Sequence, residues 1–143
     1  MHIAAQNPHA TKYLVKVLAE INSKAARIET PTRKFMPLHL AIQQKAPEDV
    51  VIALLKVYPG AAKAIFEEHQ TVLHETCRCT LSPSCVRATI KMNPNAVEVQ
   101  DKHGNLPLHI AVAYKAPADV IAILLEKFPG GAMVKNLLQN VPL

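Results

Sequence analysis

The sequence of 143 residues contains no tryptophan, and aromatic residues make up only 4% of it, although half of the residues are hydrophobic. The apolar residues are mostly alanine, leucine, valine and isoleucine, a profile that suits small, closely packed helices better than a β-sandwich. Only four glycines accompany eleven prolines. Because many of the prolines recur at regular intervals, they indicate turns and not disorder. A chain of this length can bury one ordinary core or the linear core of a short repeat array.

The small number of cysteines and the lack of long apolar runs argue against a disulfide-rich secreted protein and a membrane-spanning protein. Three cysteines, two of them separated by a single residue, form no disulfide framework and favour a reducing compartment. The N-terminus lacks the basic and apolar segments of a signal peptide. No apolar run approaches the roughly 18 residues that a membrane span needs. We therefore expect an intracellular protein, cytoplasmic or nuclear, that does not associate with membranes.

The net charge of +5 by itself permits nucleic acid or an acidic membrane as a partner. The basic residues, however, are scattered along the chain and form no run. A generally basic, solvated surface is the simpler interpretation.

One segment recurs at a fixed interval. It is a Leu-His pair, preceded by proline in two of its three copies, and the copies are 35 residues apart: Pro37, Leu38 and His39; Leu73 and His74; Pro107, Leu108 and His109. A period held this strictly predicts that one supersecondary unit is stacked repeatedly. The predicted units form a single domain over 1–143: a partial unit at 1–31, full units at 32–66, 67–101 and 102–136, and a truncated stub at 137–143.

Each full unit is predicted to hold two helices. In the second unit a short helix over 37–45 begins with proline, whose missing N–H costs nothing in a first turn. A second helix begins near Pro47, with Glu48 and Asp49 in its first turn at the positive end of the helix dipole. A Tyr-Pro-Gly sequence at 58–60 ends this helix, and a connection leads to the next unit.

These units resemble ankyrin repeats, which consist of a turn and two antiparallel helices and carry a Thr-Pro-Leu-His-x-Ala segment with a Leu-Leu pair in the second helix. The pair matches Leu54-Leu55 and Leu124-Leu125. The resemblance covers essentially the whole chain. It implies an all-α, ankyrin-like solenoid of stacked helix-turn-helix repeats with short turn or hairpin connections and no substantial sheet.

The chain departs from the family's pattern in several places. The period is 35 residues, where the family usually has about 33. Ala-Pro replaces the family's Gly-His between the helices, and the turn glycine survives only as Gly104, with Lys34 and His69 at the equivalent positions. Tetratricopeptide and pentatricopeptide repeats have similar periods, but the Pro-Leu-His segment marks neither family.

The recurring histidines invite a catalytic or metal-binding role. The family resemblance implies a structural role instead, in which the ring hydrogen-bonds backbone and holds the turn against the helix. No serine or cysteine nucleophile recurs in register with them. We expect no enzymatic activity and no cofactor.

The one cluster of metal-ligand residue types consists of His69, His74, Cys77, Cys79 and Cys85. Cys77 and Cys79 are two residues apart on a predicted helix and diverge, unlike the cysteines of a zinc knuckle. We therefore expect no metal and ordinary apolar cysteines. The sequence leaves a redox or metal role for these cysteines open.

The third unit departs furthest from the repeat. Glu75 and Thr76 stand where the other full units have an aliphatic residue followed by alanine, and Thr89 replaces the first leucine of the Leu-Leu pair. A glutamate at a normally buried position is costly unless it is paired, and Arg78, three residues further on, is a candidate partner. The unit is either a specialised polar spot or an example of drift that its neighbours tolerate.

A solenoid of two-helix units offers an extended concave surface and no deep cleft, so it is suited to bind another macromolecule. In the ankyrin family, contacts come from the turn tips and the exposed side of the first helix. The resemblance carries this role onto Thr32, Arg33, Phe35, Gln43, Gln44, Glu67, Glu68, Gln70, Arg78, Cys79, Lys102, His103, Asn105, Ala113 and Tyr114. This set mixes both charge signs with amides, whereas a phosphate-binding stripe would be uniformly basic. We therefore expect a protein partner, with Phe35, Arg78 and Tyr114 as anchors.

Two other interpretations stay open: nucleic-acid binding through the basic surface, and a structural fragment of a larger multidomain protein. Neither end of the sequence carries a polar capping unit. Apolar residues are therefore expected to be exposed at both ends: Ile3, Leu14 and Val17, and Leu137, Leu138 and Val141. We expect end-to-end self-association through the uncapped terminal repeats, or marginal stability.

Overall fold

The computed structural model describes residues 37–143, so the expected first unit and the beginning of the second lie outside the described residues. Three pairs of helices follow one another: α3 (Pro37–Gln43) and α4 (Glu48–Val57), α5 (Val72–Arg78) and α6 (Pro83–Met92), α7 (Pro107–Ala113) and α8 (Ala118–Lys127). Corresponding helices of successive pairs begin 35 residues apart. The period of the sequence is therefore the period of the structure.

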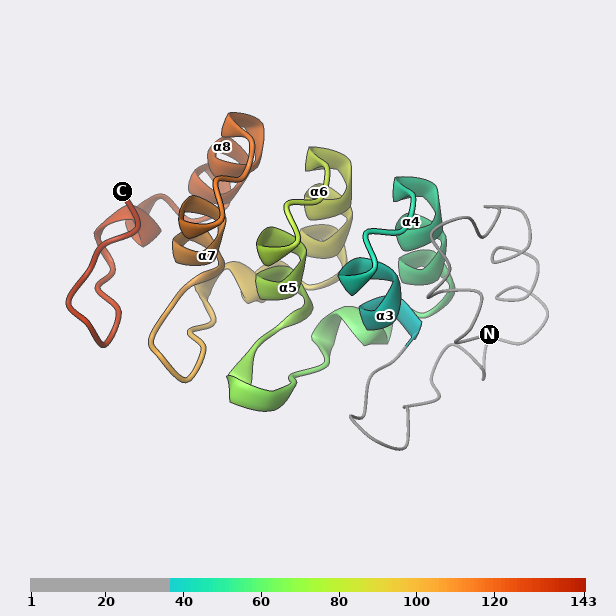
Figure 1. Ribbon diagram of the computed structural model, residues 1–143, viewed down its shortest axis with the longest axis horizontal. Helices are drawn as coiled ribbons and strands as arrows, with labels where there is room; N and C mark the ends of the chain where they lie inside the picture. Colours follow the sequence, from blue (N-terminus) through green and yellow to red (C-terminus); the bar gives the residue numbers. More distant parts are fainter. Residues whose placement is uncertain (1–36) are drawn as a thin grey trace.

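The helix pairs stack side by side in two layers. Figure 1 shows α3, α5 and α7 in one layer and α4, α6 and α8 in the layer behind it. Successive first helices contact each other, as do successive second helices. Between residues 37 and 143 the structure has no strand, and the isolated antiparallel bridge between Ile65 and Thr71 is the only β-type pairing recorded there. The predicted all-α solenoid is confirmed.

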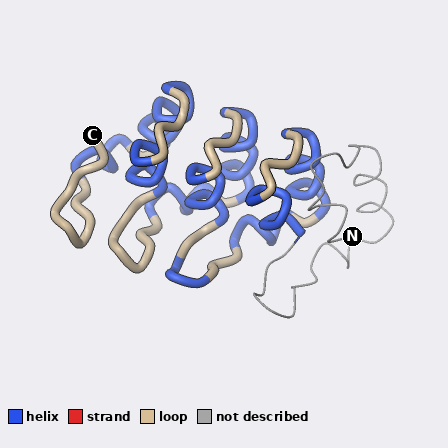
Figure 2. Tube along the Cα trace, in the orientation of Figure 1, coloured by secondary structure: helices blue, strands red, loops and turns tan. Residues whose placement is uncertain are grey.

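Short 3₁₀ helices interrupt the connections between the pairs. Each second helix is followed by one that begins at a proline: η2 (Pro59–Lys63), η4 (Pro94–Glu98) and η5 (Pro129–Met133); η3 (Glu67–His69) lies further along the first connection. The rest of each connection forms a loop that projects to one edge of the stack (Figure 2). We call these loops, at 64–71, 99–106 and 134–141, the finger loops.

The helix α3 ends earlier than the sequence predicts. The expected helix runs over 37–45, but α3 ends at Gln43, because Lys45 has a φ of 51° and turns the chain left-handed. The Lys45 N–H donates to the Ile42 carbonyl, and the Ala46 N–H donates to the Ala41 carbonyl at 2.8 Å. These two bonds form a Schellman motif, which satisfies the last carbonyls of the helix.

The core lies between neighbouring helix pairs. α4 buries Val50, Val51, Leu54 and Leu55, which recur at helical spacing on one side of the helix. At the end of the stack, Ile121 and Leu125 of α8 occupy the positions of Val51 and Leu55, but they are only half-buried because no further described helix covers them.

The threonines that interrupt the apolar pattern of the third unit are satisfied within their own helices. The Thr76 hydroxyl donates to the Val72 carbonyl at 2.8 Å, and the Thr89 hydroxyl donates to the Cys85 carbonyl at 2.9 Å. Both side chains are fully buried. Bonds of this kind, to a carbonyl one turn back, let a polar side chain stay in the core.

Candidate partner-binding face

A pocket of about 160 Å³ opens between α3 and α5, beside the first finger loop. Its lining comes from both helices and from that loop: His39, Gln43, Phe66, Glu68, Gln70, Glu75 and Arg78. Four of these residues were predicted contact positions: Gln43, Glu68, Gln70 and Arg78. The structure therefore brings predicted contact residues of the second and third units into one hollow. We call the surface formed by α3, α5, α7 and the finger loops the finger face.

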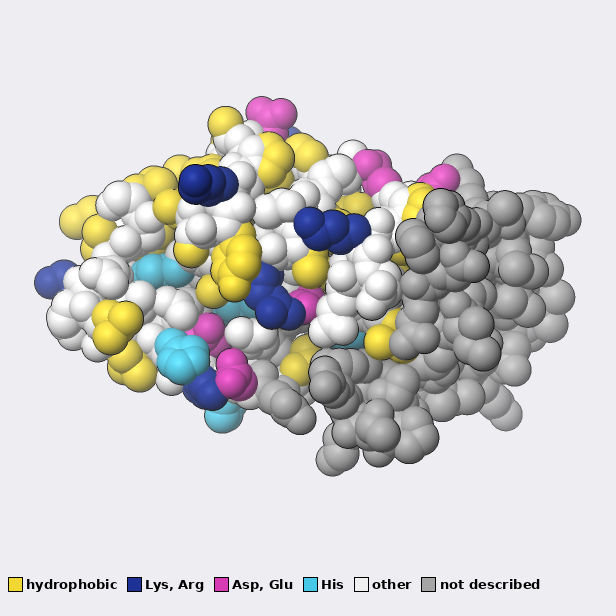
Figure 3. Space-filling view, viewed as in Figure 1, with side chains coloured by type: hydrophobic (Ala, Val, Ile, Leu, Met, Phe, Trp, Pro, Cys, Tyr) yellow, Lys and Arg dark blue, Asp and Glu magenta, His cyan; other side chains and the backbone are white. Residues whose placement is uncertain are grey.

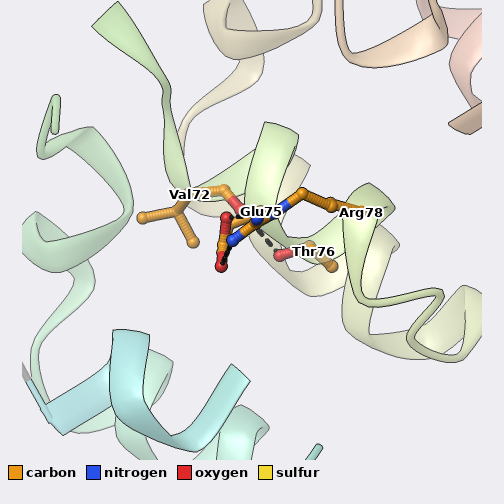
Figure 4. A network of polar contacts seen from close by, with 4 residues as sticks. All are labelled: Val72, Glu75, Thr76 and Arg78. Atoms are coloured by element: carbon orange, nitrogen blue, oxygen red, sulfur yellow. Dashed lines mark hydrogen bonds and ion pairs between the residues drawn. The ribbon is translucent and has the colours of Figure 1, made fainter. Parts of the chain in front are cut away.

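Glu75 and Arg78 form the ion pair that the sequence suggested (Figure 4). Arg78 Nε donates to Glu75 Oε2 at 3.0 Å, and Arg78 Nη2 donates to Glu75 Oε1 at 2.5 Å. The Glu75 side chain is only 7% exposed, whereas that of Arg78 is 41% exposed. The two-pronged bond compensates the buried carboxylate and fixes the plane of the guanidinium.

The electrostatics of Arg78 follow from this pairing. The hydrogen bond that Arg78 donates to Glu75 is the largest influence, and it raises the pKa of Arg78 above its ordinary value. Tyr114, exposed at the C-terminal end of α7, adds a smaller effect of the same sign on the Arg78 pKa. Figure 3 shows basic and acidic side chains next to each other over α5.

The floor of the pocket is formed by two aromatic rings. The rings of His39 and Phe66 meet edge to face, with their centroids 3.5 Å apart. His39 is almost completely buried, and burial lowers its pKa from 6.5 to about 3. The ring is therefore neutral at physiological pH, and it contributes shape and no charge to the pocket.

Charged groups also tie the finger loops to one another. Glu68 of the first loop pairs with Lys102 of the second, and the Lys102 hydrogen bond lowers the pKa of Glu68. Asp101 accepts the backbone N–H groups of His103 and Asn105 at 2.9 and 2.8 Å and thereby shapes the second loop. Lys102 and His103 are exposed, and Asn105 is half-buried.

Two of the recurring histidines, His74 and His109, bridge their helix to the next finger loop. His74 Nδ1 accepts the Thr71 N–H at 3.2 Å, so Nε2 carries the proton and donates to the Asn105 carbonyl at 2.9 Å. His109 repeats the arrangement with the Leu106 N–H at 3.0 Å and the Asn140 carbonyl at 3.1 Å. The hydrogen bonds of His74 and His109 are of the backbone-directed kind that the family resemblance implies, and their role in holding the turn stays a prediction. Burial lowers the pKa of His74.

The other predicted contact residues lie apart from the pocket or outside the description. Gln44 and Ala113 are exposed at the ends of their first helices, and Cys79 is half-buried. Glu67 lies in η3. Thr32, Arg33 and Phe35 lie outside the described residues.

Sequence reasoning did not include Phe66, His39 and Glu75 among the contact positions, although all three line the pocket. Glu75 had a signal in the sequence, because it breaks the apolar pattern of the repeat. His39 was assigned to the structural segment. Phe66 had no such signal, since its place in the pocket depends on how the finger loop folds back.

The cysteines do not converge on a site. Cys77 and Cys85 are buried and Cys79 is half-buried, and all three are free thiols. Burial raises the pKa of the Cys77 thiol to about 12, so it is neither a nucleophile nor a ready metal ligand at neutral pH. Over residues 37–143, no group of three or more metal-ligating side chains is close enough to hold a metal ion.

Stacked helix pairs with finger loops define a helical-repeat interaction module. A family model described as ankyrin repeats (3 copies) matches residues 38–137, and the chain belongs to this family. Ankyrin repeats are in general protein–protein interaction modules without enzymatic activity of their own.

Curated relatives carry the same repeats in a much longer protein. The chain is 29% identical over 131 residues to inversin of Canis lupus familiaris, 28% to that of Homo sapiens and 27% to that of Mus musculus. Each match covers 90% of this chain but only 12% of the relative. In the described part of the chain, no helix has the length and apolar character needed to cross a membrane.

Proposed function

We propose that the chain binds a protein partner on the finger face, with the pocket between α3 and α5 at its centre. The observation that carries this proposal is the Glu75–Arg78 pair. Glu75 takes the register position of Leu40 and Ile110, so the repeat itself does not need a carboxylate there. Instead, the carboxylate orients a guanidinium that remains 41% exposed at the pocket.

Arg78 has the properties of an interface anchor. Guanidinium groups carry five N–H donors, and the Glu75 bonds use Nε and one hydrogen of Nη2. The remaining donors are available to carbonyl or carboxylate oxygens of a partner. Because the side chain is already fixed by Glu75, less conformational entropy is lost when the partner binds. Tyr114, 51% exposed, is the aromatic anchor nearby.

The mixture of charges favours a protein over a nucleic acid as the partner. Glu68 and Glu75 place carboxylates in the pocket beside Arg78, and Lys102 is already paired with Glu68. Phosphates would meet these carboxylates at close range, which is unfavourable. A protein surface with both charge signs and an apolar residue for the His39–Phe66 floor is the better complement.

An intracellular location, cytoplasmic or nuclear, accords with this proposal, because Cys77, Cys79 and Cys85 are all free thiols.

Affinity capture with quantitative mass spectrometry would test the proposal. The chain, its Arg78→Ala and Tyr114→Ala variants and a Glu75→Leu variant would be compared, with Lys56→Ala on the opposite layer as the matched control. We expect the control to recover the same partner as the unmodified chain. Arg78→Ala, Tyr114→Ala and Glu75→Leu should recover less of the partner. Calorimetry with the identified protein should show an affinity that is weaker by about tenfold or more for each of them.

The Glu75→Leu variant separates binding from folding. It restores the aliphatic residue of the other units, so its free energy of unfolding should be equal to that of the unmodified chain or higher. Undiminished partner binding in all three finger-face variants would refute the proposal. Salt-sensitive binding of duplex DNA that depends on Arg78 would favour the nucleic-acid alternative instead.

A further inference from the structure

We propose that a groove between α6 and α8, in the second-helix layer, binds an acidic peptide segment with aliphatic side chains. The groove has a volume of about 410 Å³, a size typical of ligand sites. Its lining comes from the two second helices and the start of η4: Arg87, Ile90, Lys91, Pro94, Ile123 and Lys127. None of these residues belongs to the finger face, so this is a second site.

The groove combines an apolar floor with basic walls. Ile90 and Ile123 lie at its base and are almost wholly buried. Arg87, Lys91 and Lys127 are exposed around them. Ile90 and Lys91 follow Arg87 by three and four residues, and Pro94 follows them by four and three, so the four residues form one stripe along α6 and into η4. An aliphatic side chain placed over the floor would bring flanking carboxylates next to the three cations.

The repeat register shows that the fold does not require this basic cluster. Arg87 takes the position that is Ile52 in the preceding unit and Ala122 in the following one. Lys127 takes the position of Met92 and of Val57. Two of the three cations therefore replace residues that are apolar in the other units. The equivalent positions in the preceding unit and α6 include one cation, Lys56, where this groove has three.

Among the described residues, the recorded ion pairs give these cations one carboxylate partner. Glu126 is next to Lys127 on α8, and its carboxylate lies 3.8 Å from the Lys127 Nζ. Both side chains are about half exposed or more, so this contact is screened and weak. Within residues 37–143, Arg87 and Lys91 form no ion pair. The groove therefore keeps a net positive charge and is complementary to carboxylates.

A peptide fits the groove better than a nucleic acid does. Single strands are held by aromatic stacking and by a basic track that follows many phosphates. The lining has no aromatic residue, and its three cations surround a short apolar floor. Such a site matches one or two aliphatic side chains between acidic residues.

The test uses the whole chain and two fluorescein-labelled peptides of twelve residues, measured by fluorescence anisotropy. One peptide contains glutamate and leucine, and the other has glutamine in place of every glutamate. We expect the acidic peptide to bind and its affinity to fall as salt is added. The Arg87→Gln/Lys127→Gln variant should weaken binding about fivefold or more. A Lys56→Gln/Lys63→Gln variant removes the same charge elsewhere and should change it less than about twofold.

Four results would overturn the proposal. The first is equal affinity for the acidic and the glutamine peptides, and the second is an equal loss of binding in the two double variants. The third is tighter binding of a twelve-nucleotide oligothymidylate that depends on Arg87 and Lys127. The Arg78→Ala variant, which tests the finger face, should leave peptide binding unchanged. A loss of binding in Arg78→Ala would place the peptide on the finger face and would also overturn the proposal.

Discussion

Each first helix ends in a left-handed residue that is not glycine, and replacing one of these residues by glycine should stabilise the protein. The three residues have φ angles of 51°, 53° and 55°: Lys45, Thr80 and Lys115. Lys115 is the best site for a test. Its side chain is exposed, and its N–H donates to the Val112 carbonyl at 3.1 Å through backbone that glycine keeps.

The magnitude follows from two opposing effects. A left-handed conformation costs a residue with a Cβ about 1–2 kcal/mol. Glycine removes this strain, but it loses about 0.5–1 kcal/mol more conformational entropy on folding than alanine does. The Ala116 N–H bond to the Ala111 carbonyl, at 2.8 Å, does not involve the changed side chain. We therefore expect Lys115→Gly to raise the free energy of unfolding by about 0.5–1 kcal/mol.

Urea denaturation at 25 °C would measure this change, provided that the slope of the transition stays the same. Lys115→Ala removes the charge without relieving the strain, so it should not stabilise the chain. Ala122→Gly places glycine at an exposed position inside α8 and should cost about 1 kcal/mol. If Lys115→Gly destabilised the chain as much as Ala122→Gly does, the left-handed strain would not be the controlling factor at this position.

Three further predictions concern the second finger loop, the pocket floor and the end of the stack. Gly104→Ala should lower the free energy of unfolding by about 2 kcal/mol, because Gly104 has a φ of 75° and a Cβ there would lie 2.9 Å from the Leu137 nitrogen. A free energy of unfolding in urea equal to that of the unmodified chain would contradict this prediction. The depressed pKa of His39, about 3 in the folded state, means that the unfolded chain binds more protons between pH 3 and 6.5. Stability should therefore fall by about 2 kcal/mol from pH 7 to pH 5, and the slope should be shallower in His39→Gln; equal slopes in urea titrations would refute the assignment. Leu137 and Leu138 are 71% and 78% exposed, so sedimentation of the chain should show self-association. Leu138→Lys should weaken this self-association. A monodisperse monomer at high concentration would contradict the prediction.

The stacked helix pairs could be predicted from the sequence because the same helix signals recur in each unit. The helix starts at Pro37 and Pro107 and the second-helix start at Glu48 follow from proline and acidic residues in first turns. A pattern that recurs every 35 residues averages out the ambiguity of any single segment. The expected exposure of Leu137 and Leu138 followed from the same register and is confirmed.

The ends of the first helices were not predictable in the same way. Left-handed residues are usually glycine or asparagine, and neither lysine nor threonine carries that signal. The Ala-Pro and Leu-Ser-Pro sequences that follow these residues require the chain to turn before the second helix begins, and this requirement determines where the first helix ends. The 3₁₀ helices after Pro59, Pro94 and Pro129 were predicted only as connections, since i→i+3 turns leave little trace in a sequence.

The candidate pocket illustrates the same limit. The Glu75–Arg78 pair was predictable, because both residues lie on one helix at a spacing of three. The contact of Phe66 with His39 was not, because it joins a finger loop to a helix of the preceding pair. The repeat register gives the place of each residue in its unit, whereas a pocket depends on which side chains of neighbouring units contact one another.

The third unit combines the two kinds of departure that matter for function. On the finger face it replaces an aliphatic residue by Glu75, which costs burial of a charge unless Arg78 compensates it. On the opposite layer it replaces an aliphatic position by Arg87, which adds an unneutralised cation to a groove. The repeat requires neither side chain, since the other units have apolar residues at both positions. Glu75 and Arg87 lie on opposite layers of one helix pair, so the two proposals require two different ligands, because no compact ligand can reach both surfaces.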